Sequence, residues 1–509
     1  MKKQTCGRGQ AGGGDRLKPI YRIVGPGGFE ELRKTRPMVV TEPAAVAALE
    51  SIYEIIGSDF LEWDFSTAGR VKAQDGSLIA QNGALTGLNL DLFSYIVGGA
   101  EFLAEYMISD LSPLAALKDL TKLDLGPHKI SDLSPLAGLA KLTRLSLSGN
   151  KISDLSPLSN LNKLTSLDLE NNRISDLSPL AGLTQLANLS LRFNKINDLS
   201  SLAGLTKLTN LDLRGNRISN LSLLAGLTKL TNLDLMGTGI SDVSPLTKLT
   251  KLTHLNLWKN KISDLSPLAG LTQLANLSLR FNKISDLSPL TKLTKLTHLD
   301  LWKNKISDLT PLAGLAELAA LTLYENKISD VSPLTKLTKL TRLALSTNQI
   351  SNLAPLAGLT KLTQLFLDGN KINDLSPLAK LTELSYLGLK ANQISNLVPL
   401  AKLRKLDHLW LLDNMISDLS ALAGLTKLTH LLLAGNKISD LSPLAELTKL
   451  TYLSLGSNKI SDLSPLAGLI NLESVDLRNN PVTDLSPLNR LPKLKLVNGK
   501  KHKRPRAKK

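Results

Sequence analysis

The chain contains 509 residues, only one of them cysteine, and carries a formal net charge of +17 at pH 7. A chain of this length ordinarily predicts several domains. The single cysteine excludes a disulfide framework, and no stretch approaches the roughly 20 apolar residues of a membrane-spanning helix. Basic residues gather at the two ends: residues 1–22 hold six Lys or Arg against one Asp, and residues 490–509 hold ten with no acid.

Residues 1–37 are predicted to form a basic, glycine-rich and disordered head. The stretch Gly7–Gly14 lacks the GK[ST] ending that a phosphate-binding loop requires. No apolar run of about 7–15 residues follows Lys2 and Lys3, so we expect no secretory signal. Cys6 lies in the same head, and the lack of any other cysteine favours residence in the cytoplasm.

Residues 38–108 are predicted to form a small α+β cap made of a helix plus hairpins. Apolar residues recur along one helical face of Glu42–Gly57. Asp75-Gly76 and Asn82-Gly83 are turn signals between short apolar stretches. A cap is physically required, because the first turn of a repeat array would otherwise expose its leucine layer to water.

The junction between this cap and a repeat array is expected near residue 108. ISDLSPLAAL over Ile108–Leu117 matches the second half of the repeat described next. The strand half before it is degenerate, with Gly98 and Glu101 where leucines are expected. We therefore place the start of the repeat array at residue 109.

A 22-residue repeat runs from Lys129 to Pro481 without insertion or deletion. One copy, Lys141–Leu161, reads KLTRLSLSGNKISDLSPLSNL. Leucines alternate with polar residues through its LxLxL segment, which predicts one half-buried strand per copy. Because a single turn cannot bury its apolar face alone, the stacked turns are expected to share one long core.

An asparagine follows each predicted strand, from Asn150 at every 22nd residue to Asn480, and only His128 and Thr238 break this ladder. Its amide is expected to satisfy backbone groups where the chain bends, so the two exceptions should form looser turns. Asp, Ser and Pro of the following SDLSPL suit the start of a turn. About ten residues then remain, fewer than the roughly 11–12 of a mean α-helix, which predicts 3₁₀ or irregular turns.

These residues resemble the leucine-rich repeat family. The pattern I-S-D-L-S-P-L-A-G-L-T-K-L is similar to repeats of bacterial internalins and of a phosphatase-regulatory subunit. The resemblance implies an α/β solenoid over residues 109–499, with a curved parallel sheet on the concave side and short turns on the convex side. Residues 500–509 are left as a basic, disordered tail. The resemblance also implies phosphatase regulation as one alternative function.

The informative surface is the concave sheet, to which the positions six, four, two and one residues before each ladder asparagine belong. Residues 109–499 contain nine aromatic residues, and all nine occupy these columns. Neighbouring strands lie about 4.8 Å apart, so side chains of one column can touch. The predicted partner-binding residues are Phe193, His254, Trp258, Phe281, His298, Trp302, Tyr324, Phe366, Tyr386, His408, Trp410, Leu412, Leu432 and Tyr452.

Duplication is the alternative explanation for part of this pattern. PLTKLTKLTHL recurs after 44 residues, so Trp258 and Trp302 are not independent. AGLTQLANLSLRFNKI recurs after 88 residues, so Phe193 and Phe281 are not independent either. A second group, which includes Phe366, Tyr386 and Trp410, comes from non-identical repeats, so duplication does not explain it. Apolar residues gathered on a polar face indicate an interface.

Catalytic and metal chemistry find little support. Neither H-E-x-x-H nor G-x-S-x-G occurs, so no enzyme is expected and no cofactor is implied. His298 beside Asp300 suggests a metal pair, but His254 has Asn256 in the equivalent place. Charges on the concave columns are mixed, whereas a nucleic-acid groove would be one-sided.

The sequence therefore predicts a non-enzymatic scaffold that recognises a protein or peptide on its concave face, with aromatic side chains as anchors. One alternative is tethering to nucleic acid or an anionic membrane through the two basic tails, because a segment such as KKHKRPRAKK can bind such surfaces through charge alone.

Overall fold

The computed structural model describes residues 107–501 and, before them, the strand residues 21–23, 29–31, 38–40, 63–64, 71–73, 78–81 and 84–89. Two compact units are present, residues 1–172 and residues 173–509. The helix expected over Glu42–Gly57 lies outside the described residues. No helix in the described part of the chain is long and apolar enough to cross a membrane.

The first unit begins with short antiparallel pairings. β1 pairs with β2, and β5 lies between β3 and β4. β6 pairs with β7 so that Gln81 lies opposite Ala84, which matches the hairpin expected at Asn82-Gly83. The strands are β1 (Tyr21–Ile23), β2 (Phe29–Glu31), β3 (Met38–Val40), β4 (Trp63–Asp64), β5 (Val71–Ala73), β6 (Leu78–Gln81) and β7 (Ala84–Asn89).

The hairpin strand β7 also starts the parallel sheet, which corrects the expected junction. β7 pairs in parallel with β8 (Lys122–Asp124), and Leu88 lies opposite Leu123. The 22-residue spacing would have placed Glu101 there, and a carboxylate in that position would be costly to bury. Leu88 is instead buried in the leucine layer.

The rest of the first unit follows the repeat. β8 pairs in parallel with β9, and β9 with β10. The elements are η3 (Ser112–Ala116), η4 (Ser134–Leu136), β9 (Arg144–Ser146), η5 (Ser156–Leu158) and β10 (Ser166–Asp168), where η denotes a 3₁₀ helix.

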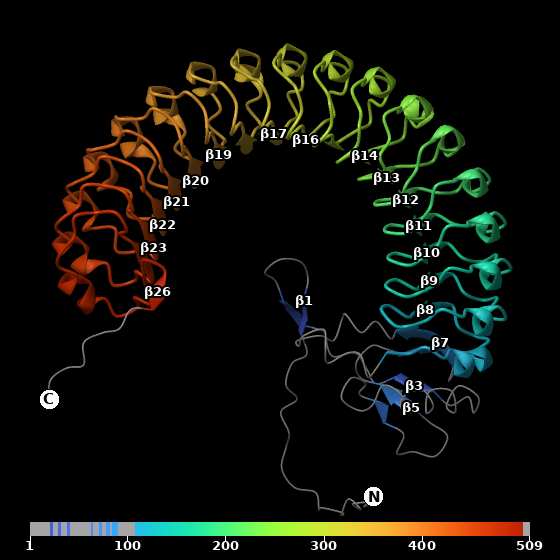
Figure 1. The fold of residues 1–509 in the computed structure, drawn as a ribbon. Helices are drawn as coiled ribbons and strands as arrows, with labels where there is room; N and C mark the ends of the chain where they lie inside the picture. Colours follow the sequence, from blue (N-terminus) through green and yellow to red (C-terminus); the bar gives the residue numbers. More distant parts are fainter. Residues whose placement is uncertain are drawn as a thin grey trace, which may run out of the picture. The chain divides into compact units, whose positions relative to one another are not determined.

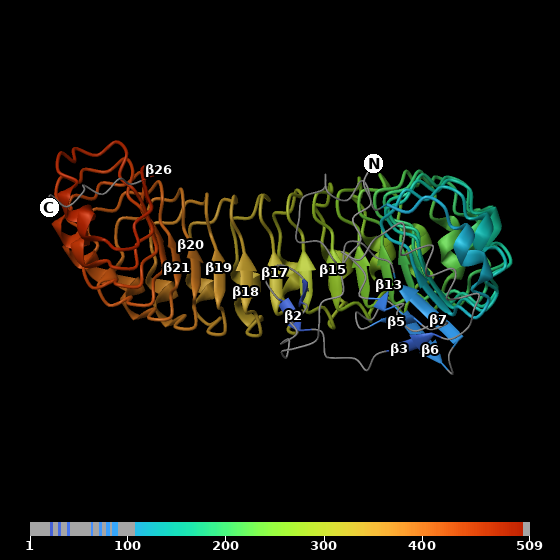
Figure 2. The same ribbon diagram turned by 90° about the horizontal axis from the view of Figure 1, so that it is seen from below.

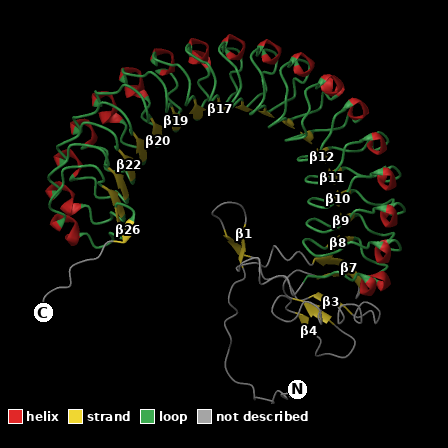
Figure 3. Ribbon diagram, in the orientation of Figure 1, coloured by secondary structure: helices red, strands yellow, loops and turns green. Residues whose placement is uncertain are grey.

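The second unit is one open parallel sheet that lines the inner edge of its arc, with 3₁₀ turns along the outer edge (Figures 1 and 3). Seen from below, its strands lie side by side (Figure 2). Each strand pairs with the next at an offset of 22 residues, as Leu255 does with Leu277. The strands are β11 (Asn188–Ser190), β12 (Asn210–Asp212), β13 (Asn232–Asp234), β14 (His254–Asn256), β15 (Asn276–Ser278), β16 (His298–Asp300), β17 (Ala320–Thr322), β18 (Arg342–Ala344), β19 (Gln364–Phe366), β20 (Tyr386–Gly388), β21 (His408–Trp410), β22 (His430–Leu432), β23 (Tyr452–Ser454), β24 (Ser474–Asp476) and β25 (Leu496–Val497).

The outer side of the second unit consists of short 3₁₀ turns, as predicted. Proline stands at the start of most of them, and the preceding Asp accepts a hydrogen bond, as Asp264 does from the Ser266 N–H at 2.8 Å. The turns are η6 (Ser178–Leu180), η7 (Ser200–Leu202), η8 (Ser222–Gly226), η9 (Ser244–Lys248), η10 (Ser266–Leu268), η11 (Ser288–Leu290), η12 (Thr310–Leu312), η13 (Ser332–Lys336), η14 (Ala354–Leu356), η15 (Ser376–Lys380), η16 (Val398–Lys402), η17 (Ser420–Leu422), η18 (Ser442–Leu444), η19 (Ser464–Gly468) and η20 (Ser486–Arg490).

The asparagine ladder satisfies the backbone between neighbouring turns. The Asn282 amide nitrogen donates to the carbonyl oxygens of Leu257 and Leu279 at 2.9 Å, and its oxygen accepts from the Ile262 N–H at 3.0 Å. At the break in the ladder, the Thr238 hydroxyl donates to the Leu235 carbonyl oxygen at 2.8 Å. The role predicted for the asparagine is therefore confirmed.

The sheet of the second unit ends in a hairpin. β25 pairs antiparallel with β26 (Lys500–Lys501), and the two connecting residues, Asn498 and Gly499, both have positive φ. This is the backbone that a two-residue hairpin turn requires. The folded part extends two residues beyond the expected boundary at Gly499.

The residue before each ladder asparagine adopts a left-handed backbone. Gly237 has a φ of 67°, and Lys259 holds the equivalent place at 57°. We expect Lys259→Gly to stabilise the second unit by up to about 1 kcal/mol, because only glycine adopts this conformation without steric cost. Gly237→Ala should destabilise it by about 1 kcal/mol, since a Cβ there meets no atom within 4 Å and the effect is purely conformational. Urea denaturation of both variants tests this, and changes of the same sign would contradict it.

Candidate partner-binding surface

The concave face of the second unit presents alternate strand residues. In β14 the middle residue, Leu255, is buried, while His254 and Asn256 on either side stay partly or fully exposed. Every strand from β11 to β24 repeats this arrangement or buries one flanking residue more. The core and the concave surface therefore use different residues of the same strand.

Four aromatic rings from consecutive repeats form what we term the central cluster: Trp258, Phe281, Trp302 and Tyr324. Phe281 meets Trp258 at a centroid distance of 6.4 Å and Trp302 edge-on at 4.7 Å. Trp302 stacks on Tyr324 at 5.4 Å. Such geometries add attraction beyond burial alone, so the rings support one another as a continuous surface.

Arg280 is part of the central cluster, although the sequence pattern marked it only as one of several mixed charges. Its guanidinium carbon lies 3.7 Å from the centroid of Trp258 and 5.7 Å from that of Trp302. One of its terminal nitrogens lies 3.7 Å from the Asp300 carboxylate. The arginine thus sits among rings with a partial counter-charge, which holds the two tryptophans in place.

Phe281 carries backbone strain. Its φ is 55°, in the left-handed region where several other repeats place glycine. A bulky residue there is uncommon. Phe193, which holds the equivalent place in a near-identical repeat, has a φ of 56°, so this backbone belongs to the repeat and does not separate Phe281 from duplication.

A second group of rings, the C-terminal cluster, contains Phe366, Tyr386, His408, Trp410, His430 and Tyr452. Tyr386 contacts Phe366 at 4.6 Å and Trp410 edge-on at 5.0 Å. A stacked column continues from Tyr386 through His408 and His430 to Tyr452, with the two imidazoles 4.3 Å apart. Leu432 lies opposite Trp410 on the next strand, while Leu412 follows β21.

Burial shifts the pKa of two groups of the C-terminal cluster. It raises the pKa of Tyr386 well above its ordinary value, and the nearby Asp368 carboxylate acts in the same direction. Burial also lowers the pKa of His430, and the neighbouring His408 adds to this. Both groups are therefore held in their neutral forms near pH 7.

Three predicted residues do not join either cluster. Phe193 is 46% exposed, with its ring beside Gly215. His254 and His298 lie on strands separated by β15, so Asn276 stands between them. Each of these histidines contacts the threonine before it. Within the described residues, no group of three or more His, Cys, Asp or Glu side chains is placed to hold a metal ion.

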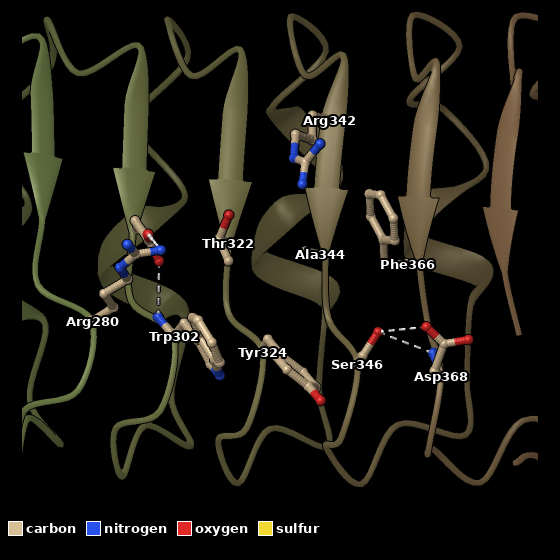
Figure 4. Close-up of a pocket in the computed structure, with 10 residues that line it drawn as sticks. Arg280, Trp302, Thr322, Tyr324, Arg342, Ala344, Ser346, Phe366 and Asp368 are labelled. Carbon is tan, nitrogen blue, oxygen red and sulfur yellow. Dashed lines mark hydrogen bonds and ion pairs between the residues drawn. The ribbon is translucent and has the colours of Figure 1, made fainter. Parts of the chain in front are cut away.

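A pocket of about 400 Å³ opens between the two clusters on strands β16 to β19 (Figure 4). Thr322 of β17 and Ala344 of β18 line it. Tyr324 stands on one side and Phe366 on the other. The positions of the aromatic residues alone did not predict this pocket, because the small side chains of Ala344 and Ser346 leave its space open.

The charged groups of the pocket already have partners. Asp368 accepts a hydrogen bond from the Lys390 N–H at 2.8 Å and one from the Ser346 hydroxyl at 3.1 Å. Arg342 donates to the Gln364 side-chain oxygen at 2.5 Å and lies over the Phe366 ring. Burial raises the pKa of both Asp300 and Asp368, against the opposing hydrogen bonds and nearby cations.

Comparisons with known proteins place the chain in a family. Residues 140–182, 228–270, 272–314, 317–358 and 426–468 match the family described as Leucine Rich repeats (2 copies). No curated protein matches the sequence.

Solved structures with the same repeats are similar to this chain. A leucine-rich repeat protein of Leptospira interrogans is 27% identical, with a TM-score of 0.62 over 76% of this chain and 98% of that chain. The functional domain of InlJ from Listeria monocytogenes is 26% identical, with a TM-score of 0.56 over 72% and 74%. The internalin InlF of the same organism is 36% identical over 66% of this chain and 87% of that chain, with a TM-score of 0.47. The chain therefore belongs to the leucine-rich repeat family, and its repeats are internalin-like.

Proposed function

We propose that this protein is a non-enzymatic scaffold that binds a protein or peptide partner on the concave face of its second unit. The observation that carries the proposal is the pair of aromatic clusters, which present half-buried rings from many consecutive strands on a face whose charges are mixed and partly paired. Aromatic side chains and arginine supply most of the energy at protein interfaces. We also propose cytoplasmic residence, in keeping with the single cysteine.

Trp258, Trp302 and Trp410 are the proposed anchors. Each is half-buried, so its ring is held by neighbours while one part remains open to a partner. Replacing all three with alanine should weaken partner binding by at least about 100-fold, since a central anchor is often worth about 2 kcal/mol or more.

A crosslinked pull-down from native lysate tests this proposal, with the triple alanine variant beside the wild type. Val398→Ala is the matched control, because Val398 lies in η16 and is 64% exposed. Circular dichroism would first show that all variants are folded. Partners lost only from the triple variant support the concave face. A partner set shared by all three proteins would contradict binding at the concave face and would favour binding through the basic tail.

A further inference from the structure

The pocket between the two aromatic clusters has a chemistry of its own. We propose that it is a socket for one uncharged aromatic side chain of an extended peptide that crosses the concave face. This inference rests on the proposed function and names the residue class that the partner presents there.

The first argument is shape. Two small side chains face the pocket from β18 and the residues after it: Ala344 is 7% exposed and Ser346 is 6% exposed. Arg342, the first residue of β18, also lines the pocket. The neighbouring repeats place Tyr324 on one side and Phe366 on the other (Figure 4). The result is a notch one repeat wide, with aromatic walls and small side chains between them.

The second argument is spacing. Tyr324 and Phe366 belong to repeats two apart and differ by two residues in column, which separates their backbone positions by roughly 12 Å. This backbone separation leaves room for one inserted side chain between the two wall residues. An inserted ring can pair with the aromatic walls, which adds attraction that an aliphatic side chain of similar length lacks.

The third argument is preorganisation. Tyr324 is stacked on Trp302 at 5.4 Å, and Phe366 packs against Tyr386 at 4.6 Å. Trp302, which also lines the pocket, holds one wall and Tyr386 holds the other, and among the described residues no ring contact joins Tyr324 to Phe366 across the notch. A ligand side chain enters a site that is already formed, which lowers the entropic cost of binding.

The fourth argument is charge. Asp300 lies beside Arg280, while Asp368 is held by the Ser346 hydroxyl and the Lys390 N–H. Arg342 is bonded to Gln364. A cationic side chain would compete with the two arginines, and an anionic one would add to two part-buried carboxylates. An uncharged ring disturbs none of these pairs.

Panning a library of random linear peptides on the full chain tests the residue class. The enriched peptides should share one Trp, Tyr or Phe. In a synthetic peptide, changing that residue to Ala, Lys or Asp should each weaken binding by at least about tenfold, and changing it to Leu should weaken it less. A consensus built on a charged residue at this position would overturn the inference.

Ala344→Leu tests the location, because the larger side chain fills the notch. Binding of the selected peptide should fall by at least about tenfold, and millimolar N-acetyl-tryptophanamide should compete with the peptide for the wild type. Ser190→Leu is the matched control, since Ser190 holds the equivalent place in β11. Phe366→Ala, which removes one wall, should reduce binding in the same way if overpacking prevents Ala344→Leu from folding.

The outcomes distinguish a failure of the aromatic socket from a failure of the proposed binding function of the concave face. Peptides that bind the Ala344→Leu variant normally but are lost from the Trp258, Trp302 and Trp410 triple variant would leave the scaffold function standing and defeat the socket. Peptides unaffected by either variant would defeat both. Sedimentation that shows a wild-type dimer and an Ala344→Leu monomer would make a second copy of the chain the occupant, which also overturns the inference.

Discussion

Asn260→Ala is expected to destabilise the second unit by at least about 3 kcal/mol. The buried Asn260 amide accepts from the N–H groups of Gly239 and Ile240 and donates to the carbonyl oxygens of Leu235 and Leu257. Alanine leaves all four backbone groups without this partner, and an unsatisfied buried group costs about 1–3 kcal/mol. Because Asn260 also serves the Thr238 turn, this step of the ladder has no substitute close by.

Urea denaturation of the Asn260→Ala variant measures this cost. Asn276→Ala is the control, because Asn276 lies on the concave face of β15 outside the ladder and should change stability by no more than about 0.5 kcal/mol. Hydrogen exchange should show lost protection around residues 235–262 first, since each repeat contacts mainly its neighbours. Equal losses in the two variants would show that the ladder bonds do not stabilise the solenoid.

Acid is expected to destabilise the repeat array, with the melting temperature falling as the pH drops from 5 to 3. The side chain and backbone of the following Ser or Thr donate to the aspartate at the start of each turn, which lowers the pKa of that aspartate. The aspartates with a lowered pKa are Asp110, Asp132, Asp154, Asp198, Asp242, Asp264, Asp308, Asp330, Asp374, Asp440, Asp462 and Asp484.

The sign of this pH dependence follows from the pKa values. A carboxyl group with a lower pKa in the folded state stabilises that state above its ordinary pKa, and the contribution is lost as the pH falls through the folded pKa. Asp234, Asp300 and Asp368 act in the opposite direction, because burial raises their pKa. The twelve aspartates therefore lose a stabilising contribution in acid, and the three buried carboxyl groups reduce that loss.

The chain offers its own control for this prediction. Asn220, Asn352 and Asn396 hold the equivalent place in other repeats and accept the same backbone hydrogen bond at 2.8–2.9 Å without titrating. A variant with Asp264, Asp308 and Asp374 changed to Asn should therefore lose stability less steeply in acid. Melting curves of both proteins from pH 7 to pH 2.5 test this, and parallel profiles would exclude the aspartate caps as the cause.

The sequence predicted the solenoid because its period leaves no freedom in where each strand falls. The alternation around Leu255 defined which residues are buried, and the columns followed from it. Two features escaped. Glu101 could not supply a core residue, so the hairpin strand β7 entered the sheet from outside the repeat. Glycine precedes several ladder asparagines, which is typical of a left-handed backbone. Phe281 adopts the same backbone, although phenylalanine rarely does so, and its residue type therefore gave no indication of it.

The candidate surface was predicted in its columns but not in its contacts. Aromatic residues could be counted, and the stacking of His408 on His430 followed from their common column. The position of Arg280 between two tryptophans depends on side-chain conformations that no spacing rule defines. The notch above Ala344 depends on small side chains, whereas the sequence prediction rested on large aromatic residues.

The closing hairpin of the second unit bears on whether further strands can add to the end of the sheet. A parallel sheet built from identical steps has an open edge onto which another strand can add, and such edges promote aggregation. β26 turns back against β25 and puts Lys500 and Lys501 at that edge. An edge strand that carries two lysines and runs antiparallel to the sheet disfavours the addition of another strand, so the hairpin ends the sheet at this edge.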